Sequence, residues 1–267
     1  MSQRKPLQGE LLRRGLVNSK TEAIEALSSN RVRVNGAVVA NGASLVANGD
    51  ALHVIDPPNR FVGRGGEKLL GALDHFGIAV ADARCIDAGA STGGFTDCLL
   101  QKGARHVLAV DVGRAQLHHR ILVDPRVTSM ESCNIADLQL GDVLDYGNGA
   151  DVLVADLSFT SLAAHVAVLV SLVAPSGQLV LLVKPQFESD RADVPVGGVV
   201  VDPVVHERAL VKVEAALLEA GCQLRGRCAS SITGTEGNQE FFVWAEKAAL
   251  YTGGHTVYTG DNAVEQR

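Results

Sequence analysis

Apolar residues come in short runs along most of this chain, and the runs alternate with segments in which apolar residues recur every three or four positions. The runs predict strands at 84–88, 106–111, 126–130, 151–156, 178–184, 224–230 and 240–246. The spaced segments predict helices at 69–76, 93–102, 115–120, 160–173 and 204–220. Apolar strands that alternate with helices indicate an α/β fold, a doubly wound Rossmann-like parallel sheet with helices on both faces. No helix is predicted between the last two strands, so we expect an antiparallel hairpin at one sheet edge.

The first part of the chain follows a different pattern. Helical spacing at 7–16 and 21–28 is followed by short strands on either side of an Asn35-Gly36 turn, and then by a strand at 52–55. This order predicts a small α+β domain at 1–59.

Proline and glycine mark the boundary between the two patterns. Pro57 and Pro58 end the first domain, and the glycine-rich segment that follows them is expected to be a flexible linker. The last twenty residues are polar and aperiodic, so we expect them to be disordered. The predicted organisation is a first domain at 1–59, a linker at 60–66, a second domain at 67–247 and a tail at 248–267.

Composition is that of a globular protein, with 46% apolar residues in 267. No apolar stretch approaches membrane length, and no apolar signal core follows the N-terminal charges, so we expect a cytoplasmic protein without a membrane partner. The five cysteines include no C-x-x-C pair, which favours reduced thiols over disulfides or a zinc site. We therefore expect no metal.

Charged residues are distributed unevenly between the two parts of the chain. Residues 1–66 carry nine Lys/Arg and five Asp/Glu, whereas the rest of the chain carries fifteen and twenty-five. A basic module beside an acidic domain indicates an anionic partner, and RNA phosphates would fit its cations. The alternative is a protein-interaction module with ordinary surface charge. The candidate RNA-binding residues are Arg13, Arg14, Lys20, Arg31 and Arg33.

The segment 85–96 predicts a buried strand that enters a glycine turn and then a helix. Glycines let the backbone approach a ligand, and the helix start offers unpaired amides. The D-x-G-x-x-x-G-G spacing is closer to loops that hold S-adenosylmethionine than to G-x-G-x-x-G. The alternative is that the loop is only a tight connection. The candidate cofactor-binding residues here are Asp87, Gly89, Ala90, Ser91, Thr92, Gly93, Gly94 and Phe95.

A carboxylate about 20 residues further on strengthens the cofactor hypothesis. Asp111 ends the next apolar run and precedes Val112, where its oxygens could accept both ribose hydroxyls of an adenosine. The alternative is an ordinary capping aspartate.

Charged residues that end the later strands are the candidates for catalysis, because the ends of central strands converge on the cofactor. Asp156 and Lys184 each close an apolar run, and Glu240 lies beside the last strand. A buried lysine must be paired or lose its proton. Lys68, on the helix before the first strand, is a second candidate cation, and the alternative for all four is a surface or capping charge.

Taken together, these motifs resemble the TlyA family of ribosomal RNA 2′-O-methyltransferases, historically called hemolysins, over residues 1 to about 247. The N-terminal unit resembles the αL-motif (S-four-type) RNA-binding module, through 14–19 and 30–36. The segments that carry the family resemblance are 87–96, 109–113, 156–159, 183–188, 198–203 and 237–242.

The resemblance implies a methyltransferase sheet and S-adenosylmethionine-dependent transfer to a ribose 2′-hydroxyl, here expected on cytidine in 16S or 23S rRNA or both. It places a Lys-Asp-Lys-Glu tetrad on Lys68, Asp156, Lys184 and Glu240, with Asp156 also near the cofactor. We expect Lys184 to be the general base, the two acids to orient the lysines and substrate, and the charge of Lys68 to favour the neutral amine of Lys184 by repulsion. The implied partners are ribosomal RNA or ribosomal subunits, and we favour a monomer.

The chain departs from the family pattern at three places. Arg114-Ala115 stands where the family usually has an aromatic residue, and Lys20-Thr21-Glu22 replaces an arginine-rich stretch in the second helix. The linker reads Arg60-Phe61-Val62 where some members carry tryptophan. Two rival functions are weighed against catalysis, namely a non-catalytic RNA-binding scaffold and a membrane-active hemolysin. Binding of labelled S-adenosylmethionine and leakage of liposomes would discriminate them.

Overall fold

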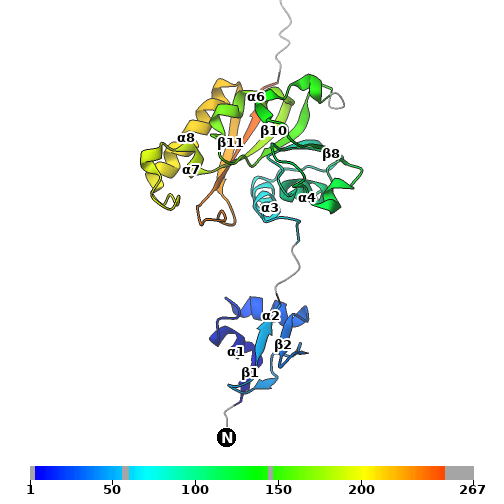
Figure 1. Cartoon of the computed structure of the whole chain (residues 1–267), viewed down its shortest axis with the longest axis vertical. Helices are drawn as coiled ribbons and strands as arrows, with labels where there is room; N and C mark the ends of the chain where they lie inside the picture. The colour runs from blue at the N-terminus through cyan, green and yellow to red at the C-terminus, as the bar shows by residue number, and fades with distance from the viewer. Residues whose placement is uncertain (1–3, 56–59, 144–146, 250–267) are drawn as a thin grey trace, which may run out of the picture. The chain divides into compact units, whose positions relative to one another are not determined.

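The computed structural model describes residues 4–55, 60–143 and 147–249. The chain forms two compact units, Met1–Asn59 and Arg60–Arg267 (Figure 1). Pro57, Pro58 and nearly all of the predicted tail lie outside the described residues.

The first unit is a small α+β unit with a core of aliphatic side chains. Leu7, Leu11, Ala23 and Val32 are fully buried in it. The Asn35-Gly36 turn has positive φ at both residues, 51° and 86°, as the predicted tight hairpin requires. Its elements are β1 (Lys5–Pro6), α1 (Leu7–Arg13), α2 (Lys20–Ser28), β2 (Val32–Val34), β3 (Ala37–Val38), β4 (Leu45–Val46) and β5 (Leu52–Val54).

Strands β3, β2 and β5 form one antiparallel sheet, and β1 pairs with β4. The pair β1–β4 was not predicted, because two-residue strands leave no periodic signal. The first helix ends at Arg13 rather than at 16, and Ser19 caps α2 by accepting a hydrogen bond from the Glu22 amide at 3.1 Å.

The second unit is built on a seven-stranded sheet in the order β11-β12-β10-β9-β6-β7-β8. The neighbours from β10 to β8 are parallel, whereas β12 is antiparallel to both β10 and β11. The predicted α/β class and the antiparallel last hairpin are therefore confirmed. The strands are β6 (Arg84–Ala88), β7 (His106–Val110), β8 (Val127–Met130), β9 (Ala150–Ala155), β10 (Val173–Val183), β11 (Cys222–Ala229) and β12 (Phe241–Lys247).

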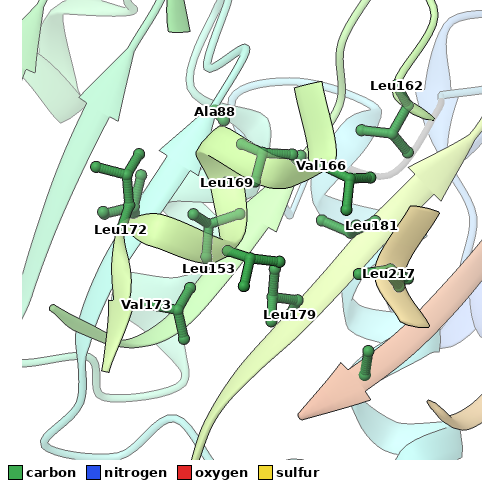
Figure 2. Close-up of a cluster of buried hydrophobic side chains, with 14 of the residues drawn as sticks. Ala88, Leu153, Leu162, Val166, Leu169, Leu172, Val173, Leu179, Leu181 and Leu217 are labelled. Carbon is green, nitrogen blue, oxygen red and sulfur yellow. The ribbon is translucent and has the colours of Figure 1, made fainter. Parts of the chain in front are cut away.

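Helices cover both faces of this sheet (Figure 1). On one face α6 and α8 pack on Leu153, Leu179 and Leu181, as Figure 2 shows. On the other face α3 and α4 pack on Val152 and Val180. Burial of alternate residues on opposite faces explains why the strands read as continuous apolar runs. The helices are α3 (Gly65–Phe76), α4 (Gly94–Gln101), α5 (His119–Leu122), α6 (Val166–Ser171), α7 (Pro185–Glu188) and α8 (Pro203–Glu219).

Several predicted elements of the second unit differ from the structure. The helix predicted at 115–120 is α5, which starts only at His119. Ala115 has a φ of 53° and cannot belong to a right-handed helix, and His118, with a ψ of 138°, is the N-cap. The helix predicted at 160–173 starts with a 3₁₀ turn at Ala163–His165 and ends at Ser171. Strand β10 begins five residues earlier than predicted, with a register shift between Val173 and Gln178.

The predicted linker 60–66 is part of the second unit, and α3 begins at Gly65. A Cβ atom on Gly66 would lie 2.3 Å from the Phe61 ring, so this glycine permits close packing rather than flexibility.

Trp244 is the single tryptophan of the chain and lies in β12. Its Nε1 donates a hydrogen bond to Gln178 Oε1 at 2.5 Å, and its ring centroid lies 5.4 Å from that of Phe76. The hairpin is thereby fastened to β10 and α3.

Candidate active site

Two adjoining cavities lie at the carboxyl ends of the parallel strands. The Asp111 cavity, of about 490 Å³, is lined by Asp111, Val112 and Ile135 among others. The lysine cavity, of about 400 Å³, is lined by the tetrad candidates. Both cavities share the residues Gly89, Ser91, Asp156, Ser158 and Phe159.

The glycine loop separates the end of β6 from the start of α4. Gly89 has a φ of 86°, and a Cβ atom there would lie 2.6 Å from the Asp156 carbonyl oxygen. Gly94 begins α4, and its Cβ would lie 3.1 Å from the Gly66 amide nitrogen. Close backbone approach therefore requires glycine at 89 and leaves little room for a side chain at 94.

Most of the predicted cofactor-binding residues line one cavity or both. Two do not line either cavity, namely Asp87 and Gly93. The other residues that line the Asp111 cavity were not predicted from the sequence, because most of them lie in loops or short 3₁₀ turns that leave no periodic signal. Their place in the segment that follows a strand was the available signal. They are Val110, Gly113, Gln116, Cys133, Asn134, Ile135, Leu157, Ser158, Phe159, Thr160 and His165.

Asp111 is held at the rim of its cavity. Its two carboxylate oxygens accept hydrogen bonds from the amides of Ser91 at 2.7 Å and Gly113 at 2.6 Å. A carboxylate oxygen has a second lone pair, so each remains available to a ribose hydroxyl. The carboxylate at the rim and the apolar wall at Val112 and Ile135 fit the sugar and the base of an adenosine.

Gly89→Ala is expected to weaken cofactor affinity by about tenfold or more, because the added methyl would push apart the glycine loop and the Asp156 backbone shared by both cavities. Equilibrium dialysis with labelled cofactor measures it. Gly221→Ala is the matched control, since Gly221 has a φ of 82° but no atom near the added Cβ. Unchanged affinity in a folded Gly89 variant would remove this loop from the cofactor site.

Asp87 is fully buried beneath the glycine loop, where its Oδ2 accepts a hydrogen bond from Thr96 Oγ1 at 2.6 Å. Burial, together with the nearby charge of Asp156, raises the pKa of Asp87 to about 7 from an ordinary value of 3.8, although the Thr96 bond acts in the opposite direction. Asp87 therefore supports the loop from below and does not line a cavity.

The raised pKa of Asp87 predicts a pH-dependent stability. Between about pH 4 and 7 the unfolded chain releases this proton while the folded chain retains it, so the stability that the group contributes is lost as pH rises. Asp87→Asn lacks this titration. The free energy of unfolding of the variant, minus that of the unaltered chain, should therefore increase from pH 5 to 8. Urea unfolding measures the difference, with exposed Asp190→Asn as control. A difference that stays constant across this range would contradict the prediction.

The four tetrad candidates meet in the lysine cavity as two ion pairs. Lys68 Nζ lies 2.5 Å from Glu240 Oε2, and Lys184 Nζ lies 2.5 Å from Asp156 Oδ1. Lys184 Nζ also donates a hydrogen bond to Ser158 Oγ at 2.8 Å. Each lysine thus has its own carboxylate, and Glu240 offsets the charge through which Lys68 was expected to repel Lys184.

These ion pairs are costly to bury. Only 10% of the Lys68 side chain and 3% of the Glu240 side chain are exposed. Desolvation of paired charges often cancels their attraction, so such pairs are weak contributors to stability. Buried charges that face a cavity are typical of a reactive site.

Glu188 ties the loop after β9 to α7, and residues of both segments line the lysine cavity. Its carboxylate accepts hydrogen bonds from the Leu162 amide and, at 2.6 Å, from Ser161 Oγ. Lys212 Nζ lies 3.5 Å from the same carboxylate. The loop after β9 is therefore fixed to α7, which follows Lys184.

Phe159 stands at the junction of the two cavities. This residue is 93% exposed, its φ is 63°, and its ring centroid lies 5.7 Å from that of Phe187. An exposed aromatic ring held in an unfavourable backbone conformation indicates a contact with a ligand.

The basic residues of the first unit differ in their freedom to bind phosphate. Arg14 donates to Glu10 and to the carbonyls of Ala47, Asn48 and Asp50, so its guanidinium is used within the unit.

The remaining candidates are less committed. Arg13 pairs with Glu10 at 2.5 Å. The hydrogen bonds that Arg13 and Arg14 both donate to Glu10 hold the pKa of Glu10 well below its ordinary range, at about 2. Arg31 and Arg33 each donate one hydrogen bond to a carbonyl, and Lys20 is exposed. These residues keep donors for a partner.

Arg14→Ala is expected to destabilise the first unit, because it removes hydrogen bonds that join α1 to the turn at 47–50. Amide hydrogen exchange in α1 should accelerate by about tenfold or more. Arg31→Ala, which removes one exposed hydrogen bond, is the control and should change exchange much less. Equal protection in both variants would show that Arg14 is dispensable for this fold.

The described residues contain no group of three or more side chains suited to hold a metal ion, and no helix among them is long and apolar enough to span a bilayer. Cys85, Cys98, Cys133, Cys222 and Cys228 form no disulfide.

Residues 61–247 match the FtsJ-like methyltransferase family, so the fold and the site define this protein as a methyltransferase of that class. One relative, named 16S/23S rRNA (cytidine-2'-O)-methyltransferase TlyA, from Mycobacterium tuberculosis, is 43% identical over 91% of this chain and 90% of the relative. Hemolysin A of Brachyspira hyodysenteriae is 36% identical over 86% of this chain and 94% of that protein. A solved structure from Streptococcus thermophilus, described as a hemolysin, aligns with a TM-score of 0.68 and 35% identity over 93% of this chain and 90% of that one. The chain belongs to the TlyA family.

Proposed function

We propose that this chain transfers a methyl group from S-adenosylmethionine to the 2′-hydroxyl of a cytidine in ribosomal RNA. The observation that carries the proposal is the pair of lysine–carboxylate contacts in a cavity that shares Asp156 with the Asp111 cavity. The name of the M. tuberculosis relative supports the choice of substrate.

The Asp111 cavity is proposed to hold the cofactor. Asp111 would accept the ribose hydroxyls, and Val112 and Ile135 would contact the adenine. When bound, S-adenosylmethionine supplies a methyl group attached to a positively charged sulfur. Asp156, at the boundary of the cavities, would face both the cofactor and the substrate.

Lys184 is proposed to act on the substrate hydroxyl. A ribose hydroxyl is a poor nucleophile, so the proton must leave as the oxygen attacks. The neutral amine of Lys184 would accept this proton, and Asp156, at 2.5 Å, would stabilise the ammonium that results. Ser158, hydrogen-bonded to Lys184 Nζ at 2.8 Å, would fix the direction of the amine.

Lys68 and Glu240 are proposed to form the opposite wall. Their contact at 2.5 Å keeps both charges in place although the side chains are buried. Glu240 would orient Lys68 and the incoming ribose, and Phe159 offers a ring on which a base of the RNA can stack.

The first unit is proposed to dock the RNA. Its basic residues contrast with the acidic remainder of the chain, and Lys20, Arg31 and Arg33 keep free donors for phosphates. The unit is expected to bring ribosomal RNA or a ribosomal subunit to the enzyme in the cytoplasm.

The test incubates the purified chain with methyl-labelled S-adenosylmethionine and ribosomal subunits that lack the modification, and then maps 2′-O-methyl groups. Label on a cytidine ribose is expected. Cofactor binding without transfer would favour the scaffold alternative, and label on a base would exclude ribose chemistry. Leakage of liposomes exposed to the same preparation would favour the hemolysin alternative.

A further inference from the structure

Arg64 differs from the two other cations that line the lysine cavity. It lies in the segment 60–66, which the sequence predicts as a linker, and its exposed side chain lines the cavity. Lys68 and Lys184 are each paired with a carboxylate of the same cavity. Arg64, in contrast, forms no ion pair with any carboxylate that the structure describes. Its charge is therefore available to a ligand.

The guanidinium of Arg64 is held by the loop between β11 and β12. Its Nη2 donates a hydrogen bond to the Thr233 carbonyl oxygen at 3.1 Å. Ser231 of the same loop donates a hydrogen bond from its Oγ to the Glu67 carbonyl oxygen at 3.2 Å, which ties the start of α3 to this loop a second time. The guanidinium is therefore oriented by the protein, and its remaining N–H donors can bind an incoming anion.

The backbone next to Arg64 lies close to the proposed reacting groups. A Cβ atom on Gly65 would lie 3.9 Å from Asp156 Oδ2, and Asp156 pairs with Lys184 at 2.5 Å. Gly65 is also the first residue of α3, the helix that carries Lys68. The side chain of Arg64 therefore starts one residue from the backbone that approaches the Asp156–Lys184 pair, and it lines the same cavity.

The structure of a ribonucleotide determines which anion accompanies the hydroxyl. In an RNA strand the 3′-phosphate is attached to the carbon next to the one that carries the 2′-hydroxyl. A 2′-hydroxyl that reaches Lys184 Nζ therefore brings this phosphate to the same cavity. A phosphate that loses water needs a cation or hydrogen-bond donors in exchange, and arginine can bind two phosphate oxygens through parallel N–H groups. The charges of Lys68 and Lys184 are already balanced by their carboxylates.

A further carboxylate of the cavity limits where a phosphate can lie. Glu236 is exposed and forms no ion pair with any cation that the structure describes. Its Oε2 would lie 3.5 Å from a Cβ atom on Gly198, which places the carboxylate beside the 198–200 segment. Repulsion disfavours a phosphate on that side of the cavity. Charge therefore directs a phosphate toward Arg64 and away from Glu236.

We propose that Arg64 binds the 3′-phosphate of the target nucleotide and thereby positions its 2′-hydroxyl in front of Lys184. Two contacts made through neighbouring carbons, one at the phosphate and one at the hydroxyl, hold the ribose in a single orientation, and such positioning lowers the barrier to transfer. Arg64 touches the substrate but takes no part in the proton transfer. The inference rests on the proposed function.

The experiment measures methyl transfer to ribosomal subunits by the full chain and three variants. Arg64→Ala removes the charge and the donors, whereas Arg64→Lys keeps the charge. Arg105→Ala is the matched control, because Arg105 is exposed, precedes β7 at its amino end and lines neither cavity. Equilibrium dialysis with labelled S-adenosylmethionine shows that each variant is folded. Cytidine 3′-monophosphate and cytidine 5′-monophosphate serve as competing probes that differ only in the position of the phosphate.

Arg64→Ala should lower kcat/KM on ribosomal subunits by about 10- to 100-fold and leave cofactor affinity unchanged. The slope of log affinity for rRNA against log salt should flatten by about one unit, because one phosphate contact is lost. Cytidine 3′-monophosphate should inhibit the unaltered chain at a lower concentration than the 5′ isomer, and this difference should disappear in the Ala variant. Arg64→Lys should keep both the slope and the difference, and Arg105→Ala should behave like the unaltered chain.

A role of Arg64 only in holding the Thr233 loop would give a different pattern. The salt slope of the Ala variant would then match that of the unaltered chain, and the Lys variant would be impaired as much as the Ala variant. That pattern would overturn the inference, and so would near-normal kcat/KM in the Ala variant. A 3′ isomer that inhibits the unaltered chain no better than the 5′ isomer would overturn it as well. Absence of ribose methylation by the unaltered chain would instead overturn the proposed function, and this inference with it.

Discussion

Lys184→Ala should lower the rate of methyl transfer by about 10²- to 10⁴-fold while cofactor affinity stays close to that of the unaltered chain. The side chain reaches Asp156 at 2.5 Å and lines the lysine cavity, but it does not line the Asp111 cavity. Its truncation therefore removes the proposed base without opening the proposed cofactor site. Single-turnover methylation and equilibrium dialysis measure the two effects separately.

Lys102→Ala is a suitable control, because Lys102 pairs with Asp74 at 2.6 Å and lines neither cavity. Lys184→Arg adds a second comparison, since guanidinium keeps the charge but cannot act as a base. Near-normal transfer by the Ala variant would exclude Lys184 as the base. Recovery of transfer by the Arg variant would assign it an electrostatic role only.

Removal of the first unit should lower the methylation of rRNA to a similar extent, but should change the affinity for the cofactor little. A chain that begins at Arg60 retains the Arg60 carbonyl, which accepts a hydrogen bond from Gln101 at 3.0 Å, and Phe61, which packs on Gly66. We expect it to fold, to bind S-adenosylmethionine and to methylate rRNA about 100-fold less efficiently than the full chain.

Salt dependence distinguishes phosphate docking from other causes of this reduced efficiency. Affinity of the full chain for rRNA should fall as salt rises, because each neutralised phosphate releases counterions. Removal of the charge of Lys20, Arg31 or Arg33 should flatten that slope by about one unit for each phosphate that the variant no longer neutralises. Equal methylation by the shortened chain, or a slope that none of these changes affects, would show that the first unit does not dock the RNA.

The sheet could be predicted from the sequence because its strands are buried on both faces. Leu153 packs on one face and Val152 on the other, so β9 is apolar from Val152 to Ala155 and stands out from the amphipathic helices. Segments with local exceptions could not be predicted in the same way. Strand β10 contains a register shift that breaks the pattern before Gln178, and Ala115 has a positive φ that no propensity encodes.

The candidate site was only partly visible in the sequence. A charge at the end of an apolar strand pointed to Asp156 and Lys184, since the ends of parallel strands meet at one edge. Tertiary distances decide which carboxylate pairs with which lysine. They also decide that Arg14 donates its hydrogen bonds within the first unit. Arg64 lies in a segment that the sequence predicts as a linker, so its place in the lysine cavity was found only in the folded arrangement.

The position of Trp244 gives the protein a built-in optical reporter. The first unit contains no tryptophan, tyrosine or phenylalanine, so intrinsic fluorescence excited at the indole band observes only the second unit. The indole is hydrogen-bonded to Gln178, and this hydrogen bond breaks when β12 separates from β10. A fluorescence melting curve therefore follows the second unit alone, whereas far-ultraviolet dichroism follows both. Different midpoints from the two signals would show that the units unfold as separate cooperative blocks, without any label or truncation.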